Sequence, residues 1–218
     1  MKSRFLLLLL LAISQSVFAA VYDVYLPITG QTGTSQSIPN VRRDIEQLDN
    51  GYRVSFYIDS VAVLADSDVE GTSNILINGF GINSTAGEAQ VPVRLERLLI
   101  PEDADVQIDI LTDDYVDYPL ELAPTRRQIP SNVDVASVDE LIEPISIVDG
   151  FFPSNLVINT DAQTYRKHRF GYFNINPVQY NSATKTVRIH YNIEYTITYN
   201  GDLTETLAEE DIHDIYLK

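Results

Sequence analysis

A strict alternation of apolar and polar residues over positions 187–199 constrains the fold of this chain more than any other feature. The apolar members are Val187, Ile189, Tyr191, Ile193, Tyr195, Ile197 and Tyr199. Because successive side chains of a strand point to opposite faces, a period of two over this length predicts a long strand with one buried face. His190 falls on the polar face of that strand, where we interpret it as a surface histidine.

Other segments have the same character. Residues 170–175 are predicted to form a strand that pairs antiparallel with 187–199 through the loop 176–185. Further strands are predicted at 21–26, 52–58, 75–77, 91–100, 106–111, 116–122, 145–148 and 156–159. Many short strands separated by turn-rich stretches predict an all-β fold, an antiparallel β-sandwich or jelly roll. Segment 41–48 fits either one helix face or the first strand of a hairpin closed by Asp49-Asn50-Gly51, and the hairpin is favoured.

The first nineteen residues have the three-part pattern of a secretory signal peptide. Lys2 and Arg4 precede an apolar run, and small residues mark a cut between Ala19 and Ala20. The run is too short to cross a bilayer, which takes about 20 residues. We therefore expect export to a periplasm, a cell surface or the medium, and no membrane span in the mature chain. The expected organisation is a signal peptide at 1–19, one β-sandwich at 20–201 and an acidic tail at 202–218.

Charge and cysteine content exclude several classes of function. The formal net charge of -16 becomes -18 when the signal is removed, which argues against a nucleic-acid partner. The chain has no cysteine, so disulfides, thiolate metal sites and a cysteine nucleophile are excluded. Residues 98–125 hold eight acids and no lysine or arginine. This tract is either a solvated face or a surface that docks a basic partner.

The sequence gives little support to catalytic or metal chemistry. The loop Asp66-Ser67-Asp68-Val69-Glu70-Gly71 begins like an EF-hand, but Ile77 stands at the twelfth position, so at most a looser calcium site remains open. His168, His190 and His213 lack the spacing of helical zinc ligands. No Gly-x-Ser-x-Gly elbow occurs, and the paired carboxylates Asp113-Asp114 carry weak support for a glycosidase. We expect no catalytic residue, no metal and no cofactor.

A short basic segment follows the acidic tract. Arg126 and Arg127 lie between Pro124 and Pro130. Proline fixes its own φ and favours an extended residue before it, so the segment has the extended form that protease clefts bind. The simpler alternative is an ordinary connection between strands with solvated arginines.

A family resemblance extends over about residues 75–200. It is carried by Gly150-Phe151-Phe152-Pro153-Ser154, by the strand from Phe170 to Ile175 with the following Pro177-Val178-Gln179-Tyr180-Asn181, by the Val-, Ile- and Tyr-rich strand after it, and by the earlier pattern around Pro92, Pro101 and Val106. This arrangement resembles the propeptide of gingipain-type cysteine peptidases. Ala89 and Ser182 depart from it at positions where proline is usual. We expect a chain without the catalytic domain that follows the propeptide in that family.

The resemblance implies a β-sandwich that assists and restrains a cysteine peptidase catalytic domain, with an inhibitory loop in the active-site cleft. Peptidases of that family cut after Arg or Lys, so Arg126, Arg127 and Gln128 are the candidate cleft-binding residues. Pro177, Gln179, Tyr180 and Asn181 are expected to form a structural turn. The chain itself is then not an enzyme. Two alternatives stay open, namely an extracellular structural or adhesive sandwich and the truncated front part of a zymogen.

Overall fold

The computed structural model describes residues 24–27, 41–83, 85–126, 144–147, 149–165 and 168–200. The expected signal peptide 1–19, its cut between Ala19 and Ala20, and the acidic tail 202–218 lie outside these ranges, as do Arg127 and Gln128. Within the described ranges, no helix has the length and apolar character needed to cross a membrane.

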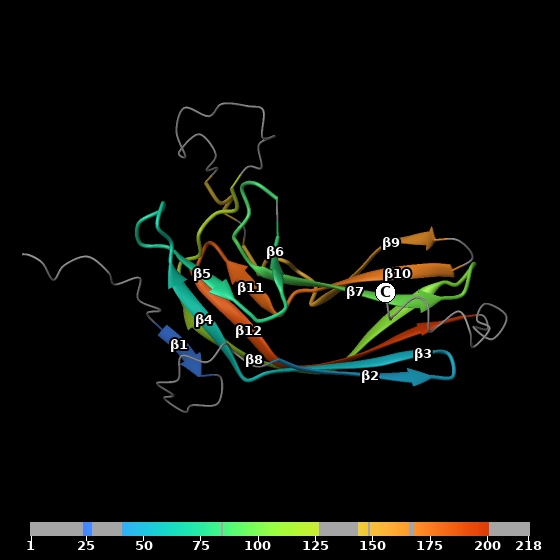
Figure 1. The fold of residues 1–218 in the computed structure, drawn as a ribbon. Coiled ribbons are helices and arrows are strands. Elements are labelled where there is room, and N and C mark those ends of the chain that lie inside the picture. The colour runs from blue at the N-terminus through green and yellow to red at the C-terminus, as the bar shows by residue number, and fades with distance from the viewer. Residues whose placement is uncertain are drawn as a thin grey trace, which may run out of the picture.

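Every regular element in the described part of the chain is a strand, as the sequence predicted. The strands are β1 (Val24–Pro27), β2 (Val41–Leu48), β3 (Gly51–Ile58), β4 (Ser60–Ala65), β5 (Ser73–Leu76), β6 (Gly81–Ile82), β7 (Pro92–Ile100), β8 (Val106–Pro119), β9 (Val157–Tyr165), β10 (His168–Ile175), β11 (Val178–Asn181) and β12 (Thr186–Tyr199). They pair antiparallel into sheets in the orders β1-β4-β5, β6-β7-β10-β9 and β11-β12-β3-β2, with β8 along the free edge of β12 (Figure 1).

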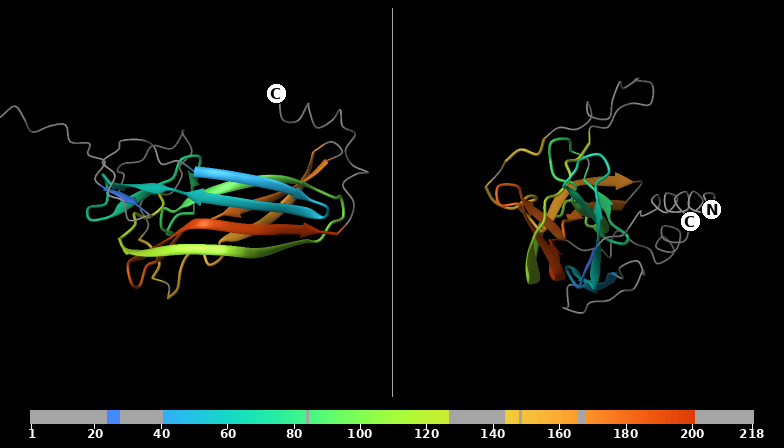
Figure 2. Two further views of the ribbon diagram at one scale, coloured as in Figure 1. Left: turned by 90° about the horizontal axis from the view of Figure 1, so that it is seen from below. Right: turned by 90° about the vertical axis from the view of Figure 1, so that its left-hand side faces the viewer.

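The β7-β10-β9 strands pack face to face on the β3-β12 strands and enclose the larger apolar core (Figures 1 and 2). Its fully buried members include Phe56, Phe173, Ile193 and Tyr195. We call this half of the molecule the sandwich end. The packing confirms the predicted antiparallel β-sandwich, in which each sheet buries one apolar face against the other.

A second apolar core lies at the other end of the long strands, where β4, β5, β11 and the start of β12 meet. Ile58, Val61, Leu122 and Ile189 are fully buried there. We call this half the loop end. Strands β3 and β12 each contribute to both cores: Phe56 and Ile193 pack at the sandwich end, and Ile58 and Ile189 pack at the loop end.

The long strand β12 confirms the predicted alternation, with a local exception. A β-bulge at Tyr191 shifts its register with β8 between His190 and Asn192. Tyr191 is half-buried. His190 is buried because Gln179 and Asp113 cover its ring, so the interpretation of His190 as a surface residue was wrong. The alternation reveals neither the bulge nor the segments that cover the polar face of the strand.

Three expectations about pairing and boundaries are corrected. Strand β10 pairs with β7 and β9, not with β12, because the connecting segment contains β11, which takes the place beside β12. The predicted strands 106–111 and 116–122 are the single strand β8, whose aspartates are exposed and which pairs with β12 along its length, with two register shifts. Residues 145–147 form no strand, and Val148 lies outside the described ranges.

The ambiguous segment 41–48 is a strand, which confirms the hairpin with β3. Gly51 begins β3 directly after the turn. A Cβ atom at this position would lie 1.9 Å from the carbonyl oxygen of Ile197, so only glycine allows the close approach of β3 to β12.

Candidate functional site

The basic segment begins on a part of the loop end that is held by backbone hydrogen bonds on both sides. On one side, the amide of Ser73 donates to the carbonyl of Glu121 (2.9 Å), and the amide of Ala123 donates to the carbonyl of Ser73 (2.9 Å). On the other side, the amide of Gln90 donates to the carbonyl of Ala123 (2.8 Å), and the amide of Thr125 donates to the carbonyl of Glu88 (2.7 Å). Residues 121–125 are therefore fixed between β5 and the segment that precedes β7.

The chain that returns after the basic segment is held by the same loop. The amide of Ser146 donates to the carbonyl of Gly87 (3.2 Å), one residue before the carbonyl that binds Thr125. The hydroxyl of Ser182 donates to the carbonyl of Ser146 (3.0 Å). We call residues 85–90, 121–126 and 144–146 the loop base. Both flanks of the segment 127–143 thus converge on Gly87 and Glu88.

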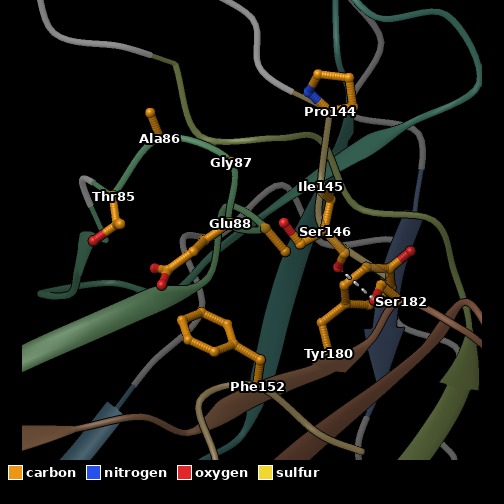
Figure 3. A pocket seen from close by; sticks show the side chains of 11 residues that line it. Thr85, Ala86, Gly87, Glu88, Pro144, Ile145, Ser146, Phe152, Tyr180 and Ser182 are labelled. Atoms are coloured by element: carbon orange, nitrogen blue, oxygen red, sulfur yellow. Dashed lines mark hydrogen bonds between the residues drawn. The ribbon is translucent and has the colours of Figure 1, made fainter. Parts of the chain in front are cut away.

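A cavity of about 350 Å³ opens within the loop base (Figure 3). Its walls come from the loop base and from Phe152, Tyr180 and Ser182. In Figure 3 the ring of Phe152 and the side chains of Tyr180 and Ser182 lie below the loop that carries Gly87 and Glu88. The cavity therefore combines an aromatic floor with a polar rim, next to the two points where the basic segment is attached.

Arg126 is the one predicted cleft-binding residue that lies in the described part of the chain, and it forms ion pairs. Its Nη2 atom lies 3.4 Å from both carboxylate oxygens of Asp66, and it also contacts Oδ2 of Asp68. The side chain of Asp66 is 3% exposed and that of Arg126 is 38% exposed. We call Asp66 and Asp68 the acidic clasp. Sequence reasoning considered these two acids for calcium and did not connect them with Arg126, sixty residues away.

The two acids at which the sequence left a looser calcium site open contact an arginine. Within the described ranges, no group of three or more acidic or histidine side chains is placed to hold a metal ion. The guanidinium of Arg126 supplies the positive charge at Asp66 and Asp68 instead.

The motif expected as a turn is mainly a buried strand. Val178–Asn181 form β11, and Pro177, Gln179, Tyr180 and Asn181 are all buried. The turn begins after them: Oδ1 of Asn181 accepts hydrogen bonds from the amides of Ala183 (3.0 Å) and Thr184 (3.1 Å). Lys185 then adopts a left-handed backbone conformation with φ of 52°. Asn181 is therefore the motif residue that shapes the turn.

Gln179 joins three segments through its side chain. Its Nε2 donates to the carbonyl of Pro153 (2.7 Å), and its Oε1 lies 2.9 Å from Nε2 of His190. The other ring nitrogen of His190 contacts the carboxylate of Asp113. Burial lowers the pKa of His190, and the neighbouring Asp113 carboxylate opposes that effect. The network fastens the segment around Pro153 to β11, β12 and β8.

An arginine on the exposed side holds the same segment. Arg188 forms a bidentate ion pair with Asp117 at 2.8 and 2.9 Å. Its guanidinium lies between the rings of Tyr115 (3.9 Å) and Phe151 (4.1 Å). Stacking and bidentate pairing suit the planar guanidinium group. The aromatic step at 151–153, which the sequence singled out, therefore anchors the wall of the cavity.

Comparison with known proteins places these features in a family. The Propeptide_C25 family model matches residues 35–215. Gingipain R1 of Porphyromonas gingivalis is 22% identical over 166 residues, covering 75% of this chain and 17% of that relative. A second gingipain R1, from a named strain of the same organism, is also 22% identical over 166 residues and is covered to 10%. The chain thus spans between a tenth and a sixth of the curated relatives it matches.

Two solved structures share the fold. A complex of the pro- and mature domains of Porphyromonas gingivalis RgpB matches with a TM-score of 0.66 and 19% identity, covering 80% of this chain and 94% of that chain. A structure addressing the zymogenic latency of gingipain K from the same organism matches with a TM-score of 0.62 and 16% identity, covering 81% and 98%. Because the family match extends over most of the sequence, this chain belongs to the Propeptide_C25 family.

Proposed function

We propose that this chain is an exported, non-catalytic module that binds a gingipain-type cysteine peptidase and restrains it by occupying its active-site cleft. Family membership supports the role of a peptidase propeptide. The RgpB relative was solved as a complex of its pro- and mature domains. We infer the same kind of partner, a cysteine peptidase catalytic domain, for this chain.

The observation that carries the proposal is the geometry of the loop base. Thr125 and Ser146 bind adjacent carbonyls, those of Glu88 and Gly87, so the described stretches on either side of residues 127–143 are attached at one place. A loop attached in this way loses less conformational freedom when it binds than a free peptide does. The segment starts with basic residues, which suits a peptidase that recognises Arg or Lys through an acidic pocket.

Inhibition of gingipain R1 tests the proposal. The mature chain, residues 20–218, is titrated into the peptidase, and hydrolysis of a chromogenic arginine substrate is measured. We expect inhibition at micromolar concentration or below. We further expect that the double variant Arg126→Ala, Arg127→Ala weakens inhibition by about 30-fold or more, the usual cost of truncating a buried charge at an interface.

The matched control is Arg42→Ala. Arg42 is an exposed arginine that also pairs with an acid, Asp59, at 3.5 Å, but it lies on β2, away from the loop base. This variant should inhibit like the unmodified chain. Absence of inhibition by the unmodified chain at micromolar concentration would refute the proposed function. If the double variant inhibits as well as the unmodified chain, Arg126 and Arg127 do not contribute to the contact with the peptidase.

A further inference from the structure

The acidic clasp is preorganised to hold Arg126. Oδ1 of Asp66 accepts hydrogen bonds from the amides of Asp68 and Val69, both at 2.9 Å, and its Oδ2 accepts one from Nδ2 of Asn74 at 2.8 Å. Burial raises the pKa of Asp66, but the hydrogen bond from Asn74, those from the two amides and the charge of Arg126 outweigh it and leave the pKa below its ordinary value. Asp66 is thus a buried, ionised carboxylate with Arg126 as its counter-ion.

The backbone next to Arg126 is fixed as well. Pro124 forms an antiparallel bridge with Ala89, and its carbonyl accepts a hydrogen bond from Nε2 of Gln90 at 2.9 Å. Thr125 is bound to Glu88 through its amide. Because this backbone is fixed, carrying Arg126 into a partner's pocket would take its side chain away from Asp66 and leave that buried carboxylate without its counter-ion. Removing one partner of a buried ion pair is costly, because the charge left behind is uncompensated.

We propose that Arg126 is a positioning residue that stays in the acidic clasp when the peptidase binds, and that it does not enter the peptidase's pocket. The ion pair fastens the loop base to the β4–β5 hairpin, so it fixes the position of Arg126, the residue directly before Arg127. This inference rests on the proposed function, and it narrows which arginine of the segment can make the cleft contact.

The two possible roles of Arg126 predict opposite effects of removing Asp68. If Arg126 enters the pocket, the clasp competes with the peptidase, and Asp68→Ala should strengthen inhibition. If Arg126 is a positioning residue, both Asp68→Ala and Arg126→Ala break the Arg126–Asp68 ion pair and weaken inhibition, and Arg126→Ala weakens it at least as much because it also removes the contact with Asp66. Asp68 suits the test because its side chain is 31% exposed, and its backbone contact with Asp66 does not need the side chain.

The experiment is a double-mutant cycle on the inhibition constant against gingipain R1. We expect Asp68→Ala and Arg126→Ala each to raise the inhibition constant by about three- to tenfold, the range for partly exposed and charge-assisted pairs. The double variant should inhibit as well as Arg126→Ala alone, because Arg126→Ala already removes the pair with Asp68. Arg126→Lys should retain part of the effect. The control is Glu70→Ala, which removes an exposed acid from the same turn.

The outcomes separate this inference from the proposed function. If the unmodified chain does not inhibit, the proposed function fails. If it inhibits, but Asp68→Ala is neutral or strengthens inhibition, or if the two substitutions act additively, the positioning role is overturned.

A second measurement does not depend on the gingipain partner. Trypsin must bind an arginine side chain in order to cut after it, so an arginine held in the clasp is protected. The rate of cleavage after Arg126 is measured by limited digestion followed by mass spectrometry. We expect it to be at least about threefold slower in the unmodified chain than in Asp68→Ala, which is the factor that the free energy of a partly exposed ion pair gives. Equal rates of cleavage after Arg126 in both proteins would show that the clasp does not hold it, and would overturn the inference.

Discussion

The two ends of the molecule are stabilised in different ways. At the sandwich end, long strands form continuous ladders and bury Phe56, Phe173 and Tyr195 between two sheets. At the loop end, the strands are shorter, and isolated bridges join Ser73 to Leu122, Ala89 to Pro124 and Phe152 to Tyr180. Buried polar groups such as Gln179 and His190 complete that end. The regular end supplies stability, while the irregular end positions the segments around the candidate site.

The largest effect is expected from Phe173→Ala at the sandwich end. Phe173 is fully buried between the sheets, so its truncation should lower the free energy of unfolding by about 3–5 kcal/mol through lost burial and a cavity. Urea denaturation measures this. Phe173→Leu, which keeps most of the volume, should cost less than about 1.5 kcal/mol. If Phe173→Ala lowers the free energy of unfolding by less than about 1 kcal/mol, Phe173 does not belong to the main core.

An intermediate effect is expected from Gln179→Ala at the loop end. The substitution leaves Pro153 O and His190 Nε2 without a partner, and each unsatisfied buried group costs about 1–3 kcal/mol. Because the contacts are local, amide exchange at Phe152, which bonds Tyr180 at 2.9 Å, should speed up more than exchange in β10. The control Asn192→Ala removes an exposed hydrogen bond to Asp114 and should change stability little. If Gln179→Ala speeds up amide exchange equally at both ends, the loop end is not stabilised separately from the sandwich end.

The smallest effect is expected from acidification through His190. Its pKa in the folded chain is lowered by burial from the ordinary 6.5, so between those values the unfolded chain binds a proton that the folded chain does not. Stability is therefore full above about pH 6.5 and falls as the pH drops toward the folded-state pKa. Asp66 and Asp117, whose pKa values are also lowered, lose their contribution below about pH 4.

Urea midpoints at pH 7.5, 6.5 and 5.5 check this prediction. The variant His190→Gln should have a flatter dependence over the same range. If stability instead rises on acidification, the attraction of Asp113 for the charged ring outweighs its burial.

Much of the fold could be predicted from local patterns. The alternation at 187–199, the hairpin at 41–58 and the long strand at 91–100 all correspond to strands, because a half-buried strand needs apolar residues at every second position. The pairing of 170–175 could not be predicted, because a pattern reveals that a strand has a buried face and not which strand lies beside it. The bulge at Tyr191 leaves no mark in the alternation, and neither do Gln179 and Asp113, which cover His190.

The candidate site shows the same limit. The sequence identified the basic segment and the aromatic step at 151–153, since proline, arginine and aromatic residues are recognisable by type. It did not pair Arg126 with Asp66, and it did not show that Thr125 and Ser146 are bound by neighbouring carbonyls. Contacts between residues sixty positions apart depend on how the hairpins pack.

The sequence by itself determined the all-β class, the long central strand and the resemblance to gingipain-type propeptides, because these depend on residue types and short spacings. The tertiary structure alone decided which sheets the strands join, that His190 is buried with Asp113 and Gln179, and that Arg126 lies in the acidic clasp. The physical reason is that pairing, burial and ion-pair partners are set by the packing of distant segments, which no local pattern encodes.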